Sequence, residues 1–600
     1  MSDLNQSILK WALKNAADFG TASPGKVLGR VLADHAECKK DVKGAMALIS
    51  AECEKVNALS KEQLAAELSN FEFEEKPKEE EGERKITVPD AVMDRVVTRF
   101  PPEPSGFPHI GHAKAAFLDY EIARQYGGYM LLRMDDTNPE KEKAEFVDAL
   151  TSGLNWLGIK WKGDITYTSD YMDKLYEYAD ELILKHKAYV CTCSAQDMKT
   201  GRETGVECDC RAQMAEDHLL LFRKMIAGKL EEGAAVLRFR GQMKAENSVM
   251  RDPTLFRIIK TPHYRQGEKY KCWPSYDFEA PIIDSIEGVT HALRSKEYEL
   301  RDELYYTIMR ILELRPVRML SISRLAISGA PLSKRLITPL LAEGKVSGYD
   351  DPRLPTLAAL RRRGIRPEAI RTFVLSFGLT KVESEPGWGK LLSENRKLIA
   401  PVSPRRFFVP DPVRVELTGA PSRILSLRNH PQIEALGSRS VEASSPLYIP
   451  LADVSALAEG EIFRLKDWCN VKITGRREEE CLLPDGTRAQ RPVLTAEFVS
   501  DTGDVSRKVQ WVSETQKKSA RVLIPGDLLL ADGSYNPDSL KTIWGWVEPA
   551  AASGPLAEAA LAGESANPYA PKATFQFERF AFVVLDKKEG ETLQFIQVSE

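Results

Sequence analysis

Two histidines three positions apart are the first residues whose types and spacing suggest chemistry. They lie in His109-Ile110-Gly111-His112, at the expected start of a helix. Backbone amides at a helix N-terminus favour an anion, and two imidazoles can donate hydrogen bonds to phosphate oxygens as negative charge develops. Gly111 leaves room for a flat nucleotide near the backbone. The alternative is a structural or metal-binding histidine pair, although no His-Glu-x-x-His motif is present.

A lysine far downstream offers a complementary charge. It lies in Leu332-Ser333-Lys334-Arg335, which follows a short apolar run. By itself, a Ser-Lys-Arg triplet carries almost no information. Beside a phosphate-binding histidine pair in an α/β chain, however, a mobile lysine can neutralise a triphosphate as pyrophosphate leaves. We therefore expect Ser333 and Lys334 to act at the same site as the histidines, from a loop.

Four of the nine cysteines form a close group, which consists of Cys191, Cys193, Cys208 and Cys210. Two Cys-x-Cys pairs suit the four thiolate ligands of a tetrahedral structural zinc site with no open coordination position. Two adjacent disulfides or four unliganded buried thiols are the alternatives. The grouping favours a reducing compartment. The remaining cysteines are expected to be ordinary buried thiols: Cys38, Cys53, Cys272, Cys469 and Cys481.

The elements that must position these residues follow from the hydrophobic pattern. Residues 95–100 are predicted to form a strand, 111–126 a helix and 129–134 a second strand. Together they form a βαβ unit with a parallel sheet, and such sheets bind ligands at the carboxyl ends of their strands. The pattern breaks near residue 190 and resumes at 276–325, which indicates an insertion.

Composition places these elements in a multidomain chain. The 600 residues carry 83 Lys and Arg against 87 Asp and Glu, a net charge of −4, and 43% are hydrophobic. At about 100–200 residues per domain, roughly three to five domains are expected. The balance excludes a protein held to nucleic acid by bulk charge, but not a local basic face. Because neither a membrane helix nor a signal peptide is recognisable, we expect a cytoplasmic protein with no membrane partner.

The regions outside the βαβ unit differ from it in predicted secondary structure and in charge. Residues 1–70 are predicted to be helical. The charged stretch over 71–90 cannot bury itself and is predicted to be a linker, with a tail-like acidic site for a partner as the alternative. Residues 345–400 are helical and basic, with seven Lys or Arg against three Asp or Glu in 345–375. Over 401–600, short alternating runs between turn residues predict an all-β region. The 1–70 region is either a docking module for a protein partner or a simple helical appendage.

On these residues the chain resembles the class I aminoacyl-tRNA synthetases, in the archaeal and eukaryotic style of their glutamyl/glutaminyl branch. The motif from His109 to His112 matches the HIGH signature of the class without change, and Pro331–Arg335 matches the KMSKS signature in the degenerate form of this branch. Its first position is Pro331 rather than lysine, so the lysine role passes only to Lys334. The likeness covers roughly 90–600 and also rests on Arg99–Lys114, Leu132–Pro139 and Tyr276–Tyr298.

The resemblance implies a multidomain α/β plus all-β fold. A Rossmann-like catalytic domain would be interrupted by an acceptor-stem-binding insertion. A helical domain would follow, whose basic face contacts tRNA stem phosphates or is simply solvated, and then anticodon-binding β-barrels. The implied boundaries are 91–195 and 271–344 for the catalytic halves, 196–270 for the insertion, 345–400 for the helical domain and 401–600 for the barrels.

The resemblance also assigns ATP, with Mg²⁺, to the two signature motifs. His109, His112 and Lys334 would be catalytic, and the same three residues would bind ATP together with Gly111 and Ser333. Zinc would bind the cysteine group, where the acceptor-stem insertion leaves the sheet.

For the amino acid, the resemblance implies that Arg99 holds a carboxylate, Asp135 pairs with the ammonium group and Tyr276 lines the pocket. Asp135 and its neighbour Asp136 have helix capping at the following turn as an alternative. Arg294 selects glutamate, because a guanidinium makes paired, charge-assisted bonds to a carboxylate and would leave donors unpaired against an amide. Glutaminyl enzymes lack this arginine; the alternative is a surface arginine after a strand.

The implied activity is that of a glutamate–tRNA ligase, which activates L-glutamate with ATP and transfers it to the terminal ribose of tRNA(Glu). The sequence leaves open whether tRNA(Gln) is misacylated as well. A glutaminyl-tRNA synthetase is the main alternative, and Arg294 opposes it. A truncated paralogue that glutamylates a modified tRNA base is opposed by the C-terminal region. A non-catalytic tRNA-binding protein is opposed by the intact His109, His112 and Lys334.

Overall fold

The structure, a computed structural model of the chain, divides into two compact units, Met1–Lys85 and Ile86–Glu600. The charged stretch predicted as a linker over 71–90 falls mostly outside the described residues. The described residues are 3–19, 21–35, 38, 41–59, 61–68, 70–71, 85–503, 505–554, 557–558 and 572–600.

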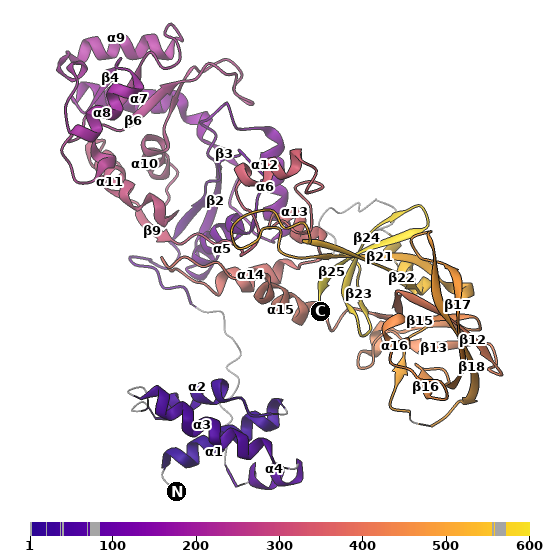
Figure 1. Cartoon of the computed structure of the whole chain (residues 1–600). Helices are drawn as coiled ribbons and strands as arrows, with labels where there is room; N and C mark the ends of the chain where they lie inside the picture. The colour runs from indigo at the N-terminus through magenta and orange to yellow at the C-terminus, as the bar shows by residue number, and fades with distance from the viewer. Residues whose placement is uncertain are drawn as a thin grey trace. The chain divides into compact units, whose positions relative to one another are not determined.

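The first unit is helical, as its sequence pattern predicts (Figure 1), and contains α1 (Asp3–Phe19), α2 (Pro24–Asp34), α3 (Val42–Asn57) and α4 (Lys61–Leu68). Ile8, Ala12 and Ala16 recur every four residues on α1 and are all buried, so one face of this helix is apolar. That face contributes to the core of the unit. Helix α3 begins where the Asp41 carboxylate accepts the Gly44 amide at 2.9 Å, which caps the helix.

The second unit contains the two strands that the βαβ pattern predicts, β1 (Val97–Phe100) and β2 (Tyr129–Met134). Three further strands that the sequence reasoning did not name also pair in parallel: β3 (Thr166–Tyr167), β8 (His291–Ser295) and β9 (Arg318–Ile322). β1 pairs with β2 and β2 with β3, and a second parallel pair joins β8 to β9. β8 begins beside β1, because the Thr290 amide donates to the Val97 carbonyl over 2.8 Å. Chain order reverses between β1 and β8, and open parallel sheets bind ligands at such a point.

The helices that follow these strands along the chain include α5 (Ile110–Gln125), α6 (Ala144–Trp156), α7 (Met172–Leu184), α10 (Tyr276–Ile286), α11 (Asp302–Ile311) and α12 (Lys334–Ala342). α5 follows β1 directly, and its residues Ala116 and Phe117 pack in one core with Leu132 of β2. The helix ends at Gln125, and Gly127 just beyond it has φ 67°, a left-handed conformation that glycine adopts at helix C-termini. The predicted end of this helix is therefore confirmed.

An antiparallel sheet interrupts the region of parallel strands and forms the predicted insertion, with β4 (Ala188–Cys191), β5 (Val236–Phe239), β6 (Thr254–Ile258), β7 (Cys272–Pro274), α8 (Ala195–Thr204) and α9 (Ala215–Ile226). The strands lie in the order β4-β5-β6-β7, and β4 and β6 are labelled at the upper left of Figure 1. The sheet begins at Ala188, earlier than the boundary expected at 196, because Cys191 belongs to its first strand.

The predicted basic helical region contains α13 (Leu357–Arg362), α14 (Pro367–Leu375) and α15 (Trp388–Ile399). Three of its arginines are held by carboxylates of the same unit: Arg353 by Asp351, Arg362 by Asp586 and Arg371 by Glu121. Part of the positive excess is therefore neutralised within the protein. Contact of this region with tRNA stem phosphates stays a prediction.

The described residues of the C-terminal region are mainly in β-strands, as predicted, and include the short α16 (Leu451–Val454). Its strands are β10 (Arg405–Arg406), β11 (Phe408–Pro410), β12 (Pro412–Thr418), β13 (Arg423–Arg428), β14 (Ser438–Ala443), β15 (Leu447–Pro450), β16 (Ile462–Leu465), β17 (Asn470–Leu482), β18 (Arg488–Ser500), β19 (Lys508–Val509), β20 (Val512–Ser513), β21 (Lys518–Pro525), β22 (Leu540–Val547), β23 (Thr574–Phe577), β24 (Ala581–Glu589) and β25 (Thr592–Ser599).

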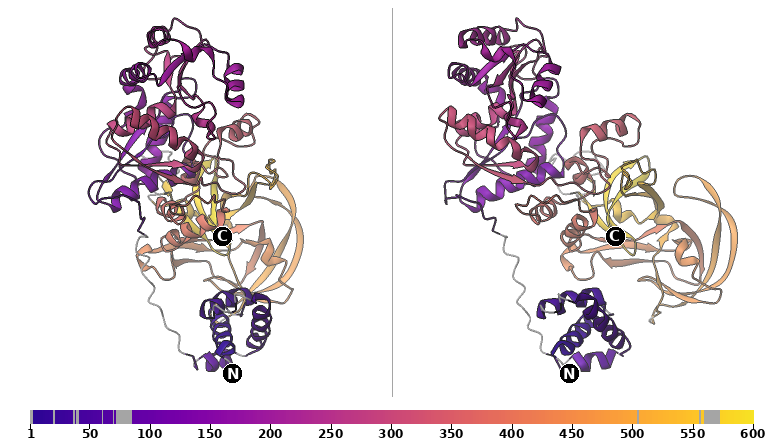
Figure 2. Two further views of the ribbon diagram at one scale, coloured as in Figure 1. Left: turned by 90° about the vertical axis from the view of Figure 1, so that its left-hand side faces the viewer. Right: turned by 60° about the vertical axis from the view of Figure 1, so that its left-hand side comes forward.

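Most of these strands form two seven-stranded sheets, in the orders β10-β23-β24-β25-β21-β22-β11 and β19-β16-β17-β18-β12-β15-β20. The two edges of the first sheet, β10 and β11, are separated in the chain only by Phe407, and β19 and β20 are likewise consecutive edges of the second. A sheet whose edges are adjacent parts of the chain must curl round on itself, as a barrel does. Figure 2 shows this curvature in the orange strands, and the predicted barrel-like architecture is confirmed.

One loop of the C-terminal region, residues 526–539, contacts the segment that leads into α12. The Leu529 amide donates to the Gly329 carbonyl over 2.9 Å. Leu528 is fully buried in one apolar cluster with Ile337 and Leu340 of α12. The barrel that carries this loop is therefore packed directly against the element that holds Lys334. In the described part of the chain, no helix has both the length and the apolar character to cross a bilayer.

Candidate active site

Two adjoining cavities, of about 1120 and about 580 Å³, lie near the carboxyl ends of β1 and β8. Both are lined by Glu103, His109, His112, Lys141, Leu332 and Ser333. The larger cavity is also lined by Gly111, Asp135, Tyr276 and Arg294, and the smaller by Lys334. Of the predicted ATP and amino-acid residues, Arg99 alone lines neither cavity. The structure thus brings residues from four separate stretches of sequence to one place.

His109 and His112 both use Nδ1 to cap helix α5. His109 Nδ1 accepts the Gly111 amide at 3.1 Å, and His112 Nδ1 accepts the His109 amide at 3.2 Å. A neutral imidazole whose Nδ1 accepts a hydrogen bond carries its proton on Nε2. Each ring therefore keeps one N–H donor, and the two ring centroids are only 4.0 Å apart. The pair can present two parallel donors to one anionic group.

Both rings are neutral at physiological pH. Burial lowers the pKa of His112 to about 4. The pKa of His109 lies well below its ordinary value, mainly because of burial and then because of His112 and Arg324 nearby. The two histidines therefore offer hydrogen-bond donors rather than fixed positive charges.

Gly111 is required by the histidine cap itself. A Cβ atom at this position would lie 2.8 Å from Cε1 of the His109 ring and 3.5 Å from the Leu325 carbonyl oxygen. A larger residue would push His109 off the Gly111 amide. The close approach seen here is that of a side chain of the protein, and approach of a nucleotide to Gly111 stays a prediction.

Ser333 and Lys334 begin a helix, whereas the sequence predicted a loop. Ser333 is the N-cap residue of α12 and Lys334 is its first residue. The helix extends this far because Ile337 and Leu340, three apart, are both buried beneath it. The Lys334 ammonium donates to the Ser105 carbonyl at 3.4 Å and lies 5.2 Å from the centre of the Phe146 ring. Lys334 is thus held over the loop that precedes the histidine pair.

Asp135 and Asp136 have different environments. Asp135 Oδ1 is buried without a hydrogen-bond partner, and burial raises the pKa of Asp135 to about 6 although Arg133 nearby opposes the shift. Both oxygens of Asp136 are used, since they accept the Ser169 amide and hydroxyl at 2.8 Å each. The prediction that Asp136 caps the turn that follows it is therefore wrong, because its oxygens instead hold Ser169 in the distant turn at 168–171. Asp135 retains a free acceptor at the cavity.

Arg294 is buried at the end of β8 and is not the surface arginine of the alternative interpretation. Only 7% of the residue is exposed. Its guanidinium carbon lies 5.9 Å from the ring centre of Tyr276 and 5.0 Å from that of Tyr305. Nη2 donates to Asp302, the first residue of α11. The two tyrosines and Asp302 together hold the guanidinium at the cavity wall.

Arg99 lies beneath the cavity and is fully buried. Its Nε donates to Asp284 Oδ1 and its Nη1 to the Leu293 carbonyl, each at 3.0 Å. Arg133 donates to the same Asp284 oxygen at 2.7 Å. Nη2 of Arg99 is buried without a partner. Contact with a carboxylate of the amino acid stays a prediction, and Nη2 is the donor that remains for it.

The larger cavity is lined by charged residues that the sequence reasoning missed: Glu103, Lys114, Asp119, Lys141, Glu142, Arg257, Asp277, Arg301 and Arg324. Lys114 is only 1% exposed, and its ammonium donates to the carbonyl and hydroxyl of Ser323 at 2.8 and 3.0 Å. Burial lowers the pKa of Lys114. A lysine on the buried face of the predicted helix, two positions after His112, was the available signal.

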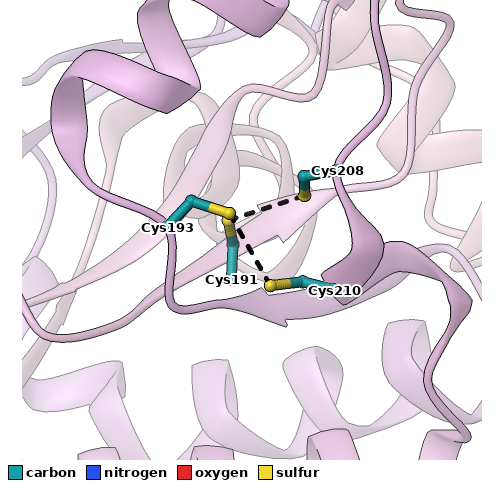
Figure 3. A group of neighbouring side chains, drawn as sticks. All are labelled: Cys191, Cys193, Cys208 and Cys210. Carbon is teal, nitrogen blue, oxygen red and sulfur yellow. Dashed lines mark hydrogen bonds between the residues drawn. The ribbon is translucent and has the colours of Figure 1, made fainter.

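The four grouped cysteines form a separate centre in the insertion (Figure 3). Their Sγ atoms all lie within 4.8 Å of one another, and the Cys191–Cys208 and Cys193–Cys210 pairs are 3.8 Å apart. Four thiolates at about 2.3 Å from a tetrahedral zinc ion would be about 3.8 Å apart. All four cysteines are free, so the disulfide alternative is wrong. The donor set fits zinc.

Comparisons with known proteins agree with this arrangement. Residues 95–399 match the family described as tRNA synthetases class I (E and Q), catalytic domain, and residues 403–482 match the anti-codon binding domain of that class. The chain is 44% identical to a glutamate–tRNA ligase of Nitrosopumilus maritimus, over 91% of this chain and 94% of the relative. The chain is 42% identical to the glutamate–tRNA ligase of Cenarchaeum symbiosum, over 92% of this chain and 94% of that relative. It is 36% identical to the glutamate–tRNA ligase of Pyrococcus abyssi, over 98% of each chain.

Proposed function

Because the chain belongs to the family of class I tRNA synthetases for glutamate and glutamine, we propose that its two adjoining cavities are where glutamate is activated and passed to tRNA. Its activity is that of a glutamate–tRNA ligase, as in relatives that match it along nearly their whole length. One observation carries the assignment to this site. The histidine pair and Ser333, which precedes Lys334, line the wall that the two cavities share.

Glutamate recognition would rest on three charged groups. A zwitterion with an additional carboxylate needs one anion and more than one cation. Asp135 has a buried oxygen without a partner that can accept the ammonium group. Arg294 would bind the side-chain carboxylate with charge-assisted hydrogen bonds, beside the ring of Tyr276, and Nη2 of Arg99 remains for a carboxylate. Glutamine would present an N–H group to the Arg294 donors and leave them unpaired.

Activation needs no general base, because the α-carboxylate of glutamate is already ionised. One of its oxygens bonds to the α-phosphorus of ATP, the bond from that phosphorus to the bridging oxygen breaks, and pyrophosphate leaves with the electron pair. Glutamyl-adenylate remains. Negative charge develops on the phosphate oxygens during this step, where the Nε2–H groups of His109 and His112 can donate. Lys334 would act on the leaving pyrophosphate from the smaller cavity.

Transfer then joins the acyl group to tRNA(Glu). A hydroxyl of the terminal ribose attacks the carbonyl carbon of the adenylate, the bond from that carbon to the phosphate oxygen breaks, AMP leaves with the electron pair, and the hydroxyl proton passes to solvent. By the likeness to this branch, the 2′-hydroxyl is the acceptor and activation requires bound tRNA. The barrels, which match an anticodon-binding family in part, would select the tRNA by stacking and hydrogen-bonding its unstacked bases. Acceptance of tRNA(Gln) as a second substrate belongs to the same proposal.

Two metals enter this proposal differently. Cys191, Cys193, Cys208 and Cys210 would hold a structural zinc ion, which when bound would fix the first strand of the insertion to its 208–210 turn. Apart from these four, no group of three or more close metal-binding side chains occurs among the described residues. Mg²⁺ commonly binds through phosphates, water and one or two carboxylates, so we propose that it arrives with ATP. A ligase that serves the ribosome also belongs in the cytoplasm.

The test is aminoacylation with purified tRNA(Glu) and tRNA(Gln), each offered glutamate and glutamine in separate reactions. Glutamate should be transferred to tRNA(Glu), and glutamine to neither tRNA. Transfer of glutamine but not glutamate would instead support a glutaminyl enzyme. No transfer of either amino acid would contradict catalysis at this site and favour a tRNA-binding protein. The tRNA(Gln) reaction with glutamate decides whether the enzyme discriminates between the two tRNAs.

A further inference from the structure

We infer that Asp302, a residue outside both cavities, is a positioning residue that sets the orientation of Arg294 and thereby the preference of the enzyme for glutamate. The inference rests on the proposed function, in which Arg294 receives the side-chain carboxylate. It concerns a residue that contacts the wall of the pocket from behind and does not itself line the cavity. Asp302 would act on the substrate only through the guanidinium that it holds.

The contact is built from two rigid elements. Arg294 is the fourth residue of β8, which is paired along its whole length with β9. Asp302 is the first residue of α11, in the turn where a carboxylate is favoured by the helix dipole. Arg294 Nη2 donates to Asp302 Oδ1, and the two side chains are 5% and 28% exposed. The Arg294 side chain is therefore shielded from water, whereas that of Asp302 is partly exposed.

Aromatic rings limit the remaining freedom of the guanidinium. Tyr276 and Tyr305 lie within about 6 Å of it, which is the range of a cation–π contact. Tyr305 is itself fixed, because its hydroxyl donates to Asp284 Oδ2 at 2.9 Å and the residue is 2% exposed. With the plane constrained by the rings, the hydrogen bond to Asp302 sets how the guanidinium is turned within that plane.

Arg294 uses one N–H group to bind Asp302 and keeps others that can bind the substrate. A guanidinium has five N–H donors, and among the described residues the only side-chain hydrogen bond of Arg294 is the one to Asp302. Arg294 lines the larger cavity, whereas Asp302 does not. Asp302 therefore occupies the side of the guanidinium that faces away from the cavity, and the remaining donors are free for a carboxylate. Without Asp302, Arg294 would have to be ordered by the substrate itself.

The charge of Asp302 has the opposite effect from its hydrogen bond. A second carboxylate on the same guanidinium reduces the attraction that a glutamate carboxylate experiences. An asparagine keeps an oxygen that can accept from Nη2 but carries no charge. Asp302→Asn should therefore preserve the orientation and bind glutamate at least as well as the natural enzyme, while Asp302→Ala should lose the orientation.

Glu303 provides a matched control, because it lies in the same first turn of α11 and does not contact Arg294. Its carboxylate accepts from Asn247 Nδ2 at 2.8 Å. Glu303→Ala thus removes an acidic residue from the same helix terminus. The experiment measures KM for glutamate and for ATP, and kcat, in aminoacylation of tRNA(Glu) by the full chain, for the natural enzyme, Asp302→Ala, Asp302→Asn and Glu303→Ala.

We expect Asp302→Ala to raise KM for glutamate by about tenfold or more, the equivalent of one lost hydrogen bond, and to leave KM for ATP within about twofold. Asp302→Asn and Glu303→Ala should keep KM for glutamate at or below about twice the natural value. The inference is overturned if Asp302→Ala leaves KM for glutamate unchanged, if it raises KM for ATP by the same factor, or if either of the other variants behaves like it.

Failure of this inference is distinguishable from failure of the proposed function. If the natural enzyme transfers no glutamate to tRNA, the proposed function fails. If it transfers glutamate normally and Asp302→Ala does so with the same KM, only the positioning role fails. Should Asp302→Ala not fold, the comparison of Asp302→Asn with the natural enzyme still tests the inference, since a rise of about tenfold in KM for glutamate would contradict it.

Discussion

The ammonium group of Lys334 donates a hydrogen bond to the carbonyl oxygen of Ser105, 229 positions earlier in the chain, over 3.4 Å. Ser105 belongs to the loop that leads to the histidine pair, and Lys334 belongs to the second signature motif and begins α12. This contact therefore joins the second motif to the loop before the first motif, without any substrate. The carbonyl is a weak partner for a full charge, so Lys334 can exchange it for a phosphate oxygen.

Replacement of Lys334 by alanine should lower kcat for aminoacylation by about 10²–10³, because preorganised charge at a leaving group typically contributes this much. KM for glutamate should change little, since Lys334 lines only the smaller cavity. Steady-state kinetics with saturating tRNA measure both quantities. An unchanged kcat would remove Lys334 from the reaction.

His109 has a structural and a proposed catalytic task, and two substitutions separate them. His109→Ala loses the cap on α5 and should lower the free energy of unfolding by about 0.5–2 kcal/mol. His109→Asn keeps a good N-cap residue but has no Nε2–H, so stability should return while kcat stays about 10²–10³ below that of the natural enzyme. Denaturant unfolding and kinetics on both variants provide the test. Recovery of kcat in His109→Asn would mean that His109 serves only the helix.

Glutamate binding should release protons near neutral pH. The pKa of Asp135 in the free protein is about 6, because burial outweighs the effect of Arg133. An ammonium group beside the carboxylate favours its charged form and so lowers this pKa. Between about pH 5 and 7 a fraction of Asp135 is protonated before binding and ionised afterwards. Calorimetry of the tRNA-bound enzyme in buffers with different ionisation enthalpies measures the release, which Asp135→Asn should abolish.

Arg294→Ala should lower kcat/KM for glutamate by at least about 100-fold, because a buried site that pairs with a carboxylate loses its charge-assisted hydrogen bonds. Arg294→Lys retains a positive charge but not the planar fork, and should recover only part of the loss. KM for ATP serves as the internal reference. If Arg294→Ala raised KM for ATP by the same factor as KM for glutamate, this result would indicate a collapsed pocket rather than a lost contact.

The cysteine group should bind about one zinc ion per chain, as measured by elemental analysis of purified protein. Cys208→Ser combined with Cys210→Ser should remove it, because two of the four ligands are lost. Cys481→Ser is the matched control, since this partly exposed cysteine lies outside the group. A metal content that is unchanged in the double variant, or absent from the natural protein, would contradict the site.

The sequence predicts well those features that depend on short spacings. The βαβ unit, the histidine pair at the start of α5 and the group of four cysteines are each defined within a few neighbouring residues or by a periodic pattern. Local rules of hydrogen bonding and packing govern such features. The start of α12 was missed because it depends on the burial of Ile337 and Leu340 against Leu528 of the distant barrel loop.

Contacts between distant elements could not be predicted in the same way. Lys114 finds its acceptors on Ser323, 209 positions away, and Arg99 meets Asp284 across 185 positions. Even Arg294 and Asp302, only eight positions apart, meet because β8 and α11 are held by different neighbours. Residue types indicate that buried charges need partners, but only the packed fold selects them. The sequence therefore identifies the signature residues and not the groups that orient them.

The order of strands in the first seven-stranded sheet has a consequence for the timing of synthesis. β25 is an inner strand, paired with β24 on one side and with β21 on the other. At about 5–20 residues per second, the ribosome needs roughly 4–15 s to proceed from the end of β21 to the end of β25. During that interval one edge of β21 has no permanent neighbour, and exposed edges invite wrong pairing. We expect nascent chains to be most prone to aggregation in these seconds, long after the catalytic half has been translated.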